Sequence, residues 1–250
     1  MADERELIKK RFTELSERSY SSGIFTFTDF LGLAEQSLLR ECERLFASGV
    51  TLFGGAPDCE RVMARFGSEE ELGYSVDFPI VCIKAEPKSQ KFADKLTHRD
   101  FLGALLSLGI ERDVLGDIAI IDNIGYIFAA EDIASFIISE LSSVKHTDVA
   151  LSLTEPPREA LSRTERKMIQ ANGERLDAVI AKVFSLSRDE AQLLFSRGLV
   201  FASGREISST SYIPKQNEII SVRTKGRFIY RGYETLSRKG KLNIAVDLYV

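Results

Sequence analysis

Basic side chains at helical spacing within residues 174–222 are the groups whose types and positions suggest chemistry. Arg175 and Lys182 lie seven residues apart, so they would share one face of an amphipathic helix. Arg188 would lie in the first turn of the following helix, with Gln192 four residues further on. Cations held on rigid elements suit phosphate groups, so this segment predicts contact with a polyanion.

The start of the second predicted helix adds a possible anion site. Ser187 precedes Glu190 by three residues, a spacing that predicts a capping box with Ser187 as the N-cap. The N-terminus of a helix favours anions through its free N–H groups and its dipole. We therefore expect a phosphate site beside Arg188.

More cations follow toward the C-terminus, and aromatic residues alternate with them. The aromatic residues are Tyr212, Phe228, Tyr230 and Tyr233. Such alternation is typical of backbone contact combined with stacking on unpaired bases. The alternative is a solvated charged surface with Phe228 and Tyr230 partly in the core. The predicted RNA-contact set comprises Arg175, Lys182, Ser187, Arg188, Gln192, Arg197, Arg205, Lys225, Arg227 and Arg231.

The charges are divided unevenly between the two parts of the chain. Residues 1–157 carry 16 Lys and Arg against 27 Asp and Glu, a net charge of −11. Residues 158–250 carry 17 against 10, a net charge of +7, and the overall −4 hides this division. The asymmetry predicts a nucleic-acid-binding segment, the alternative being uneven surface charge without function. Pro156-Pro157 predicts a stiff linker at the same place.

The elements that must position these residues predict an α+β protein. Two amphipathic helices followed by short strands are expected after residue 161, and residues 242–250 alternate as a final strand. Residues 78–153 read as strand, helix, strand, strand, helix, strand, the order of the split βαβ or ferredoxin-like (RRM-like) plait. Its third strand, residues 126–129, contains no Lys or Arg. A structural or protein-docking role for this plait is therefore favoured over base stacking.

The first segment is expected to be mainly helical and to act as a scaffold. Thr28 is expected to cap a helix, and residues 50–53 are expected to pair with residues 61–66 as a hairpin. The predicted domains are residues 1–75, 76–155 and 156–250.

The basic segment also resembles a known module, the S4 RNA-binding domain. The resemblance rests on Arg175-Leu176-Asp177, on Ser187-Arg188 with Ala191, and on Gly198, Val200 and Gly204. This αL-like module occurs in ribosomal protein S4, bacterial tyrosyl-tRNA synthetases, pseudouridine synthases and heat-shock protein 15. The resemblance implies a C-terminal S4 domain with a β extension across residues 156–250.

A wider resemblance covers nearly the whole chain. Residues 96–110 with Gly116-Asp117-Ile118, and residues 226–241, are similar to YlmH-type proteins. That family has a helical N-terminal domain, a plait-like RNA-binding domain and a C-terminal S4 domain. The resemblance implies binding to rRNA and peptidyl-tRNA on the large ribosomal subunit. It also implies a part in ribosome-associated quality control, in the C-terminal tailing of stalled nascent chains.

Other functions are less favoured by the sequence. His98-Arg99-Asp100 matches the start of a kinase catalytic loop, but the other kinase motifs are missing. Asp177 corresponds to the nucleophile of certain pseudouridine synthases, but only about 70 residues follow it. An RNA-modifying enzyme of that type, and a protein-interaction adaptor tethered by the S4 module, remain the alternatives to a non-enzymatic RNA-binding protein.

The remaining composition predicts neither a cofactor nor a metal site. Three scattered cysteines fit a reducing compartment, and the two histidines lack zinc-ligand spacing. The charged N-terminal residues and the lack of a long apolar run predict a cytoplasmic protein without a membrane span. We expect it to be a monomer.

Overall fold

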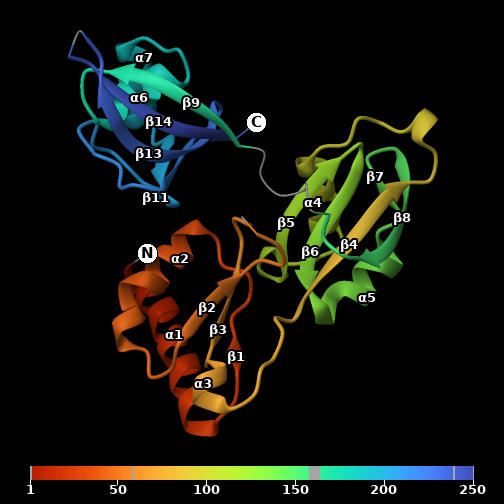
Figure 1. Cartoon of the computed structure of the whole chain (residues 1–250). Coiled ribbons are helices and arrows are strands. Elements are labelled where there is room, and N and C mark those ends of the chain that lie inside the picture. The colour runs from red at the N-terminus through yellow and green to blue at the C-terminus, as the bar shows by residue number, and fades with distance from the viewer. Residues whose placement is uncertain (1, 58, 158–163, 239, 250) are drawn as a thin grey trace. The chain divides into compact units, whose positions relative to one another are not determined.

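The computed structural model describes residues 2–57, 59–157, 164–238 and 240–249 (Figure 1). The chain divides into two compact units, Met1–Leu161 and Ser162–Val250. The predicted domains 1–75 and 76–155 both lie within the first unit, and the division between them stays a prediction. Helices accompany antiparallel sheets in both units, which confirms the α+β class.

The beginning of the first unit contains three helices and a small sheet. The helices are α1 (Ala2–Ser22), α2 (Leu33–Cys42), which continues into η1 (Glu43–Leu45), and α3 (Glu69–Leu72). The strands are β1 (Thr26–Phe27), β2 (Val50–Phe53) and β3 (Met63–Phe66), in the order β1-β3-β2. Phe12, Leu39 and Phe66 lie at the centre of its core. The predicted hairpin is confirmed as β2 and β3.

The expected helix cap at Thr28 is wrong. Gly32 is the N-cap of α2, and its N–H donates to the Glu35 carboxylate at 2.7 Å. The Thr28 hydroxyl accepts from the backbone N–H of Ala64 at 2.9 Å and donates to the Asp29 carbonyl at 2.7 Å. Thr28 therefore extends the contact with β3, and the helix begins one turn later.

The rest of the first unit has the predicted element order. Its elements are β4 (Ile80–Pro87), η2 (Gln90–Phe92), α4 (His98–Ser107), η3 (Arg112–Val114), β5 (Leu115–Ile121), β6 (Ile124–Ala130), α5 (Glu131–Glu140), β7 (Ser143–Val144) and β8 (Thr147–Thr154). The antiparallel sheet has the order β5-β6-β4-β8-β7. Phe101 and Leu105 of α4 and Ile137 of α5 pack against Ile83 and Ile127 of the sheet. The two helices therefore cover one face of the sheet.

The other face of this sheet is partly closed. Strand alternation and register place Cys82 and Lys84 of β4 opposite Phe128 and Tyr126 of β6 on that face. Phe128 is 0% exposed, and a Cβ added to Gly55 would lie 2.3 Å from its Cδ1. The backbone at Gly55 thus seals the Phe128 ring from solvent.

Arg61 and Asp117 join the start of the unit to its larger sheet. The Arg61 guanidinium donates to the carbonyls of Leu115 at 2.8 Å and Phe30 at 2.7 Å. The Asp117 carboxylate accepts the backbone N–H groups of Glu60 at 2.6 Å and Arg61 at 3.2 Å. Burial lowers the pKa of Arg61 and raises that of Asp117. These bonds hold residues 60 and 61 against β5.

The second unit is a six-stranded antiparallel sheet with two helices on one face. Its elements are β9 (Thr164–Ala171), α6 (Leu176–Val183), α7 (Arg188–Ser196), β10 (Val200–Ala202), β11 (Arg205–Glu206), β12 (Glu218–Val222), β13 (Gly226–Leu236) and β14 (Leu242–Tyr249). The sheet order is β11-β10-β12-β13-β14-β9. Two register shifts in β13 mark bulges, which bend a sheet. The predicted C-terminal strand is confirmed as β14.

Gly55 should be intolerant of a side chain. Its φ is +100°, and a Cβ would overlap the Phe128 ring, so Gly55→Ala should lower the free energy of unfolding by about 2–4 kcal/mol. Gly73→Ala is the matched control, because Gly73 has φ +76° with nothing within 4 Å of the added Cβ. That variant should lose only about 1–2 kcal/mol. Urea unfolding of both variants measures the difference, and equal losses would contradict the packing of Gly55 on Phe128.

Candidate nucleic-acid interface

The buried carboxylate of Asp177 organises the polar groups at the start of α6. Asp177 is 0% exposed, and its oxygens accept from Arg175 Nε at 3.2 Å, Arg175 Nη2 at 3.0 Å and the Ala178 N–H at 2.9 Å. Arg188 Nε at the start of α7 lies 3.8 Å from the same carboxylate. One buried anion therefore brings together two of the predicted contact arginines.

The pKa of Asp177 shows how well this anion is stabilised. Burial alone would raise the pKa, but hydrogen bonds from Arg175, Gln192 and the Ala178 N–H outweigh burial and leave it below the usual value. Asp177 is therefore ionised at neutral pH. Its negative charge holds the Arg175 guanidinium, whose side chain is 44% exposed, and attracts that of Arg188, which is 66% exposed. Each arginine keeps further N–H donors for an external phosphate.

A loop after β11 covers the N-terminus of α6. The Leu176 N–H donates to the Tyr212 carbonyl at 2.8 Å, and Arg175 Nη2 donates to the Thr210 hydroxyl at 3.5 Å. The Tyr212 hydroxyl donates to the Glu218 carboxylate at 3.0 Å. Burial first, then this bond, raises the pKa of Tyr212 to about 12. Tyr212 is thus half-buried and anchored, and it helps to fix Arg175.

The N-terminus of α7 is satisfied within the protein. The Glu190 N–H donates to the Ser187 hydroxyl at 3.2 Å, and the Ser187 N–H donates to the Glu190 carboxylate at 2.8 Å, so the predicted capping box is confirmed. Asp189 and Glu190 add negative charge to this turn. A phosphate would have to displace Glu190, which leaves the Arg188 guanidinium as the donor offered at this end.

Three more predicted cations lie at the edges of the helices. Lys182 is exposed on α6, and Arg197 is exposed at the C-cap of α7. The Ser187 N–H and hydroxyl lower the pKa of Glu190, and the charge of Lys225 adds to that shift, so Lys225 lies near the start of α7. Arg205 is exposed on β11, at the edge of the sheet.

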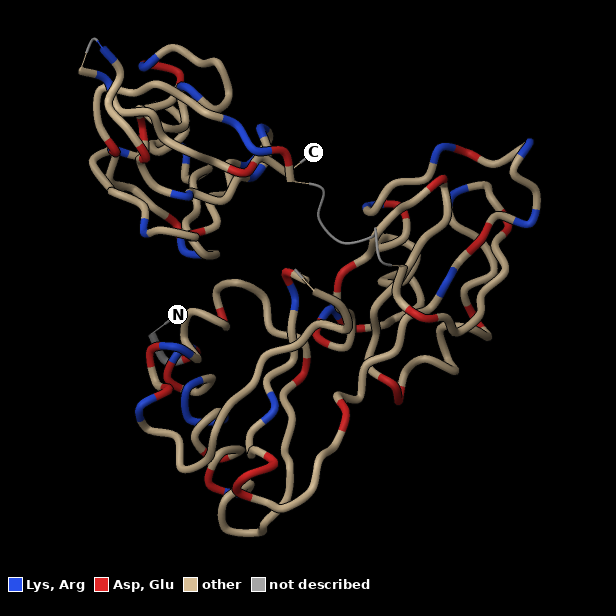
Figure 2. The backbone as a smooth tube through the Cα atoms, viewed as in Figure 1, with Lys and Arg blue, Asp and Glu red and all other residues tan. Residues whose placement is uncertain are grey.

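The structure does not unite all predicted residues on one surface. Phe228 and Tyr230 are 0% and 1% exposed in the core beneath the helices, so the prediction that they stack on bases is wrong. Arg227 and Arg231 alternate with them on β13 and therefore face away from α6 and α7. Figure 2 shows basic residues on several strands of this unit as well as on its helices.

Arg231 and Arg227 are held by partners on that opposite sheet face. Arg231 Nε donates to Asp247 at 2.7 Å, and its Nη1 donates to Asn217 at 2.7 Å. The Arg227 guanidinium lies 4.9 Å from the centre of the Tyr249 ring. The two residues stabilise the sheet, whereas Arg175, Arg188 and Gln192 converge on Asp177. Sequence reasoning missed Asp177 as the organiser, although a charged residue within the apolar stripe of α6 was a usable signal.

Comparison with known proteins finds relatives of this chain, and the family match lies in the first unit. Residues 75–156 match the family model described as "Putative RNA-binding domain in YlmH". The chain is 27% identical over 229 residues to the ribosome-associated protein quality control protein P2 of Bacillus subtilis (strain 168), covering 88% of this chain and 86% of that protein. The resemblance to YlmH-type proteins is thereby confirmed. The cell division protein ylmH from Streptococcus pneumoniae also matches, at 21% identity and a TM-score of 0.49, over 60% of this chain and 91% of that structure.

Three further observations bear on other functions of this chain. Within the described ranges, no cluster of His, Cys, Asp or Glu could hold a metal ion. No helix among these residues combines the length and apolar character needed to cross a membrane. The Asp177 carboxylate is fully buried and hydrogen-bonded, so it is poorly placed to act as a nucleophile on a nucleotide.

Asp177→Asn should destabilise the second unit by about 1–3 kcal/mol at pH 7, because charge-assisted hydrogen bonds are lost. The folded-state pKa of Asp177 is lowered, so its contribution is full above the unfolded value of about 4 and disappears as the pH falls through the folded value. Urea unfolding at pH 7 and at lower pH measures this trend. Asp189→Asn, at an exposed position on α7, is the control and should change stability by less than about 1 kcal/mol. Equal effects at both positions would contradict the role given to Asp177.

Proposed function

We propose that this chain is a non-enzymatic RNA-binding protein of ribosome-associated quality control. In this proposal residues 156–250 act as an S4 domain that contacts rRNA and peptidyl-tRNA on the large ribosomal subunit. The observation that carries it is the convergence of Arg175 and Arg188 on the buried Asp177. The net charge of +7 over residues 158–250 also favours binding of a polyanion by this part of the chain. The name of the Bacillus relative supports the ribosomal context.

The arrangement favours recognition of folded RNA by its backbone. Arg175 is hydrogen-bonded to Asp177 and the same carboxylate attracts Arg188, so the two guanidinium groups lie near one another and can bind neighbouring phosphates. Lys182, Arg197 and Lys225 are longer-range contributors at the edges of the helices. Phosphate contacts supply most of the affinity in such complexes, while RNA shape supplies most of the selectivity.

The remainder of the proposal concerns the first unit and the cellular role. Residues 76–155 act as a ferredoxin-like, RRM-like domain, and residues 1–75 act as a scaffold for it. The protein works as a cytoplasmic monomer and assists the C-terminal tailing of stalled nascent chains. Incubation with rRNA followed by nucleoside mass analysis tests the non-enzymatic assignment, and a new modified nucleoside would overturn it.

Arg188→Ala should weaken co-sedimentation with the large ribosomal subunit, because it removes a guanidinium that is 66% exposed and lies 3.8 Å from the Asp177 carboxylate. Circular dichroism and thermal unfolding should stay close to wild type. Lys241→Ala removes an equal charge at an exposed site before β14 and should leave co-sedimentation nearly unchanged. With about four phosphates contacted, log K should fall with log salt at a slope of roughly −3 to −4. Equal losses in both variants, or affinity independent of salt, would refute the proposed interface.

A further inference from the structure

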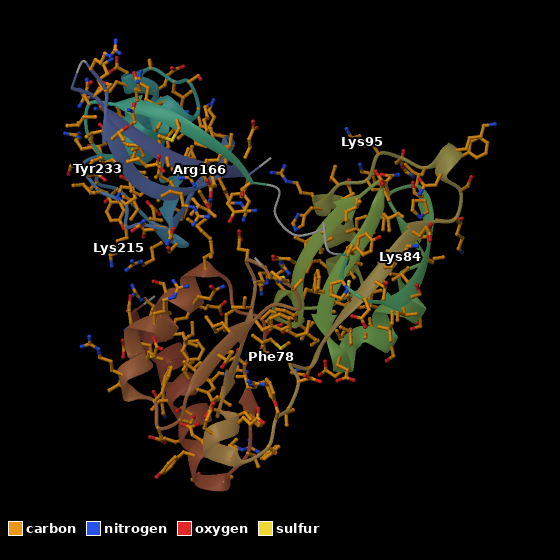
Figure 3. All side chains as sticks on the ribbon, viewed as in Figure 1. Phe78, Lys84, Lys95, Arg166, Lys215 and Tyr233 are labelled. Carbon is orange, nitrogen blue, oxygen red and sulfur yellow. The ribbon has the colours of Figure 1, made fainter. Side chains whose placement is uncertain are left out.

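The first unit has a local reversal of charge in the loop between β4 and α4. Residues 88–99 carry Lys88, Lys91, Lys95 and Arg99 against Asp94, within a segment, residues 1–157, whose net charge is −11. These four cations are exposed. Figure 2 shows the basic positions spaced along this loop, and Figure 3 shows Lys95 extending away from the strands.

An aromatic ring stands among these cations. Phe92, at the end of η2, is 80% exposed, the highest value among the exposed large apolar side chains of the described residues. Lys91 Nζ lies 5.5 Å from the centre of its ring. Because this ring is exposed and lies among cations, it is available for stacking on a base.

The base of the loop is fixed by hydrogen bonds from two neighbouring turns. The Leu96 N–H donates to Asn123 Oδ1 at 2.7 Å, and Asn123 Nδ2 donates to the Asp94 carbonyl at 2.9 Å. The Asp94 N–H donates to the Thr147 hydroxyl at 2.8 Å. On the other side, the Lys88 N–H donates to the Asp148 carbonyl at 2.9 Å. The tip that bears Phe92 is therefore presented from a rigid base.

The sheet face of this domain is a poor alternative for base stacking. Phe128 is sealed beneath Gly55, and Lys84 is paired with Glu86 at 2.7 Å. Tyr126 on the same face is half-buried, but the charge of Lys84 beside it is already neutralised by Glu86. At the loop of residues 88–99, by contrast, an exposed ring and exposed cations are both accessible to a nucleic acid.

We propose that the loop of residues 88–99 is a second RNA-contact site, at which an unpaired base stacks on Phe92 and lysines bind the flanking phosphates. Single-stranded RNA fits better than an acidic protein segment, because protein hot spots combine an anchor with surrounding apolar surface. Phe92 is the exposed large apolar residue within this loop, and its neighbours are cations. A recess of about 340 Å³ lined by Lys95, Leu96 and Ile120 leaves space beside the loop.

The inference extends the proposed RNA-binding function but uses residues of the other compact unit. The chain contains no tryptophan, so Phe92→Trp in the full-length protein gives a fluorophore that reports only on this loop. A single-stranded oligo(A) of 12 nucleotides should quench its emission saturably, because a base that stacks on the indole is in direct contact with the fluorophore. Tyr20→Trp is the matched control, since Tyr20 is a 71% exposed aromatic residue of the same unit. Its emission should change little.

The charged part of the site is tested in the same background. Lys91→Ala with Lys95→Ala should weaken the quenching and reduce the slope of log K against log salt by about 1.4, the value for two phosphates of a single strand. Arg188→Ala should leave the quenching in place, which separates a failure here from a failure of the proposed function in the second unit.

Three outcomes would overturn the inference. They are unchanged emission of the Phe92→Trp protein at saturating oligonucleotide, equal quenching of the Tyr20→Trp protein, and a response to a polyglutamate peptide but not to RNA. The first two would remove the stacking site, and the third would make the loop a protein contact.

Discussion

A carboxylate that is removed from water has to be matched by donors, and Asp177 imposes this constraint on the second unit. Its position in the first turn of α6 puts it beneath the loop that carries Thr210 and beside α7. Two N–H groups of Arg175, the Ala178 N–H and Gln192 supply the donors, with Arg188 nearby. Removal of one partner from a buried charge is destabilising, so folding and the placement of the arginines are linked. Arg175 is thereby held more firmly than a lysine on a solvated helix would be.

The same logic separates arginines that hold the fold from arginines that are available to a partner. Arg231 has two short hydrogen bonds to Asp247 and Asn217, and Arg61 is bound to the carbonyls of Phe30 and Leu115. Arg188 has a longer ion pair, of 3.8 Å, and a largely exposed side chain. Charge counts along the sequence cannot make this distinction, because it depends on which face of each strand or helix carries the cation.

The sequence predicted the elements with strong periodicity and failed where local and tertiary signals disagree. The order of the four longer strands and two helices from β4 to β8, the capping box at Ser187, and the alternation of β14 followed from spacing alone. β9 escaped prediction because its residues 164–168 are exposed and only Ile169 and Ala171 point into the core. For the site, the sequence predicted a contact set within one domain but did not assign its members to faces. The alternation of Arg227 and Arg231 with the buried Phe228 and Tyr230 divides it, and only the packing of α6 and α7 reveals which side is which.

In the larger sheet of the first unit, the face opposite the helices is partly covered, which limits how RNA can bind there. A plait that stacks bases needs exposed rings on its central strands, and here Phe128 is fully buried by Gly55. That ring packs with Ala56 and Cys59, and Arg61 and Asp117 reinforce the junction. Opening the sheet face would therefore require breaking buried hydrogen bonds and exposing apolar surface, which is unfavourable. Contact through the loop of residues 88–99 at the end of the sheet requires neither change, because the Phe92 ring is already exposed.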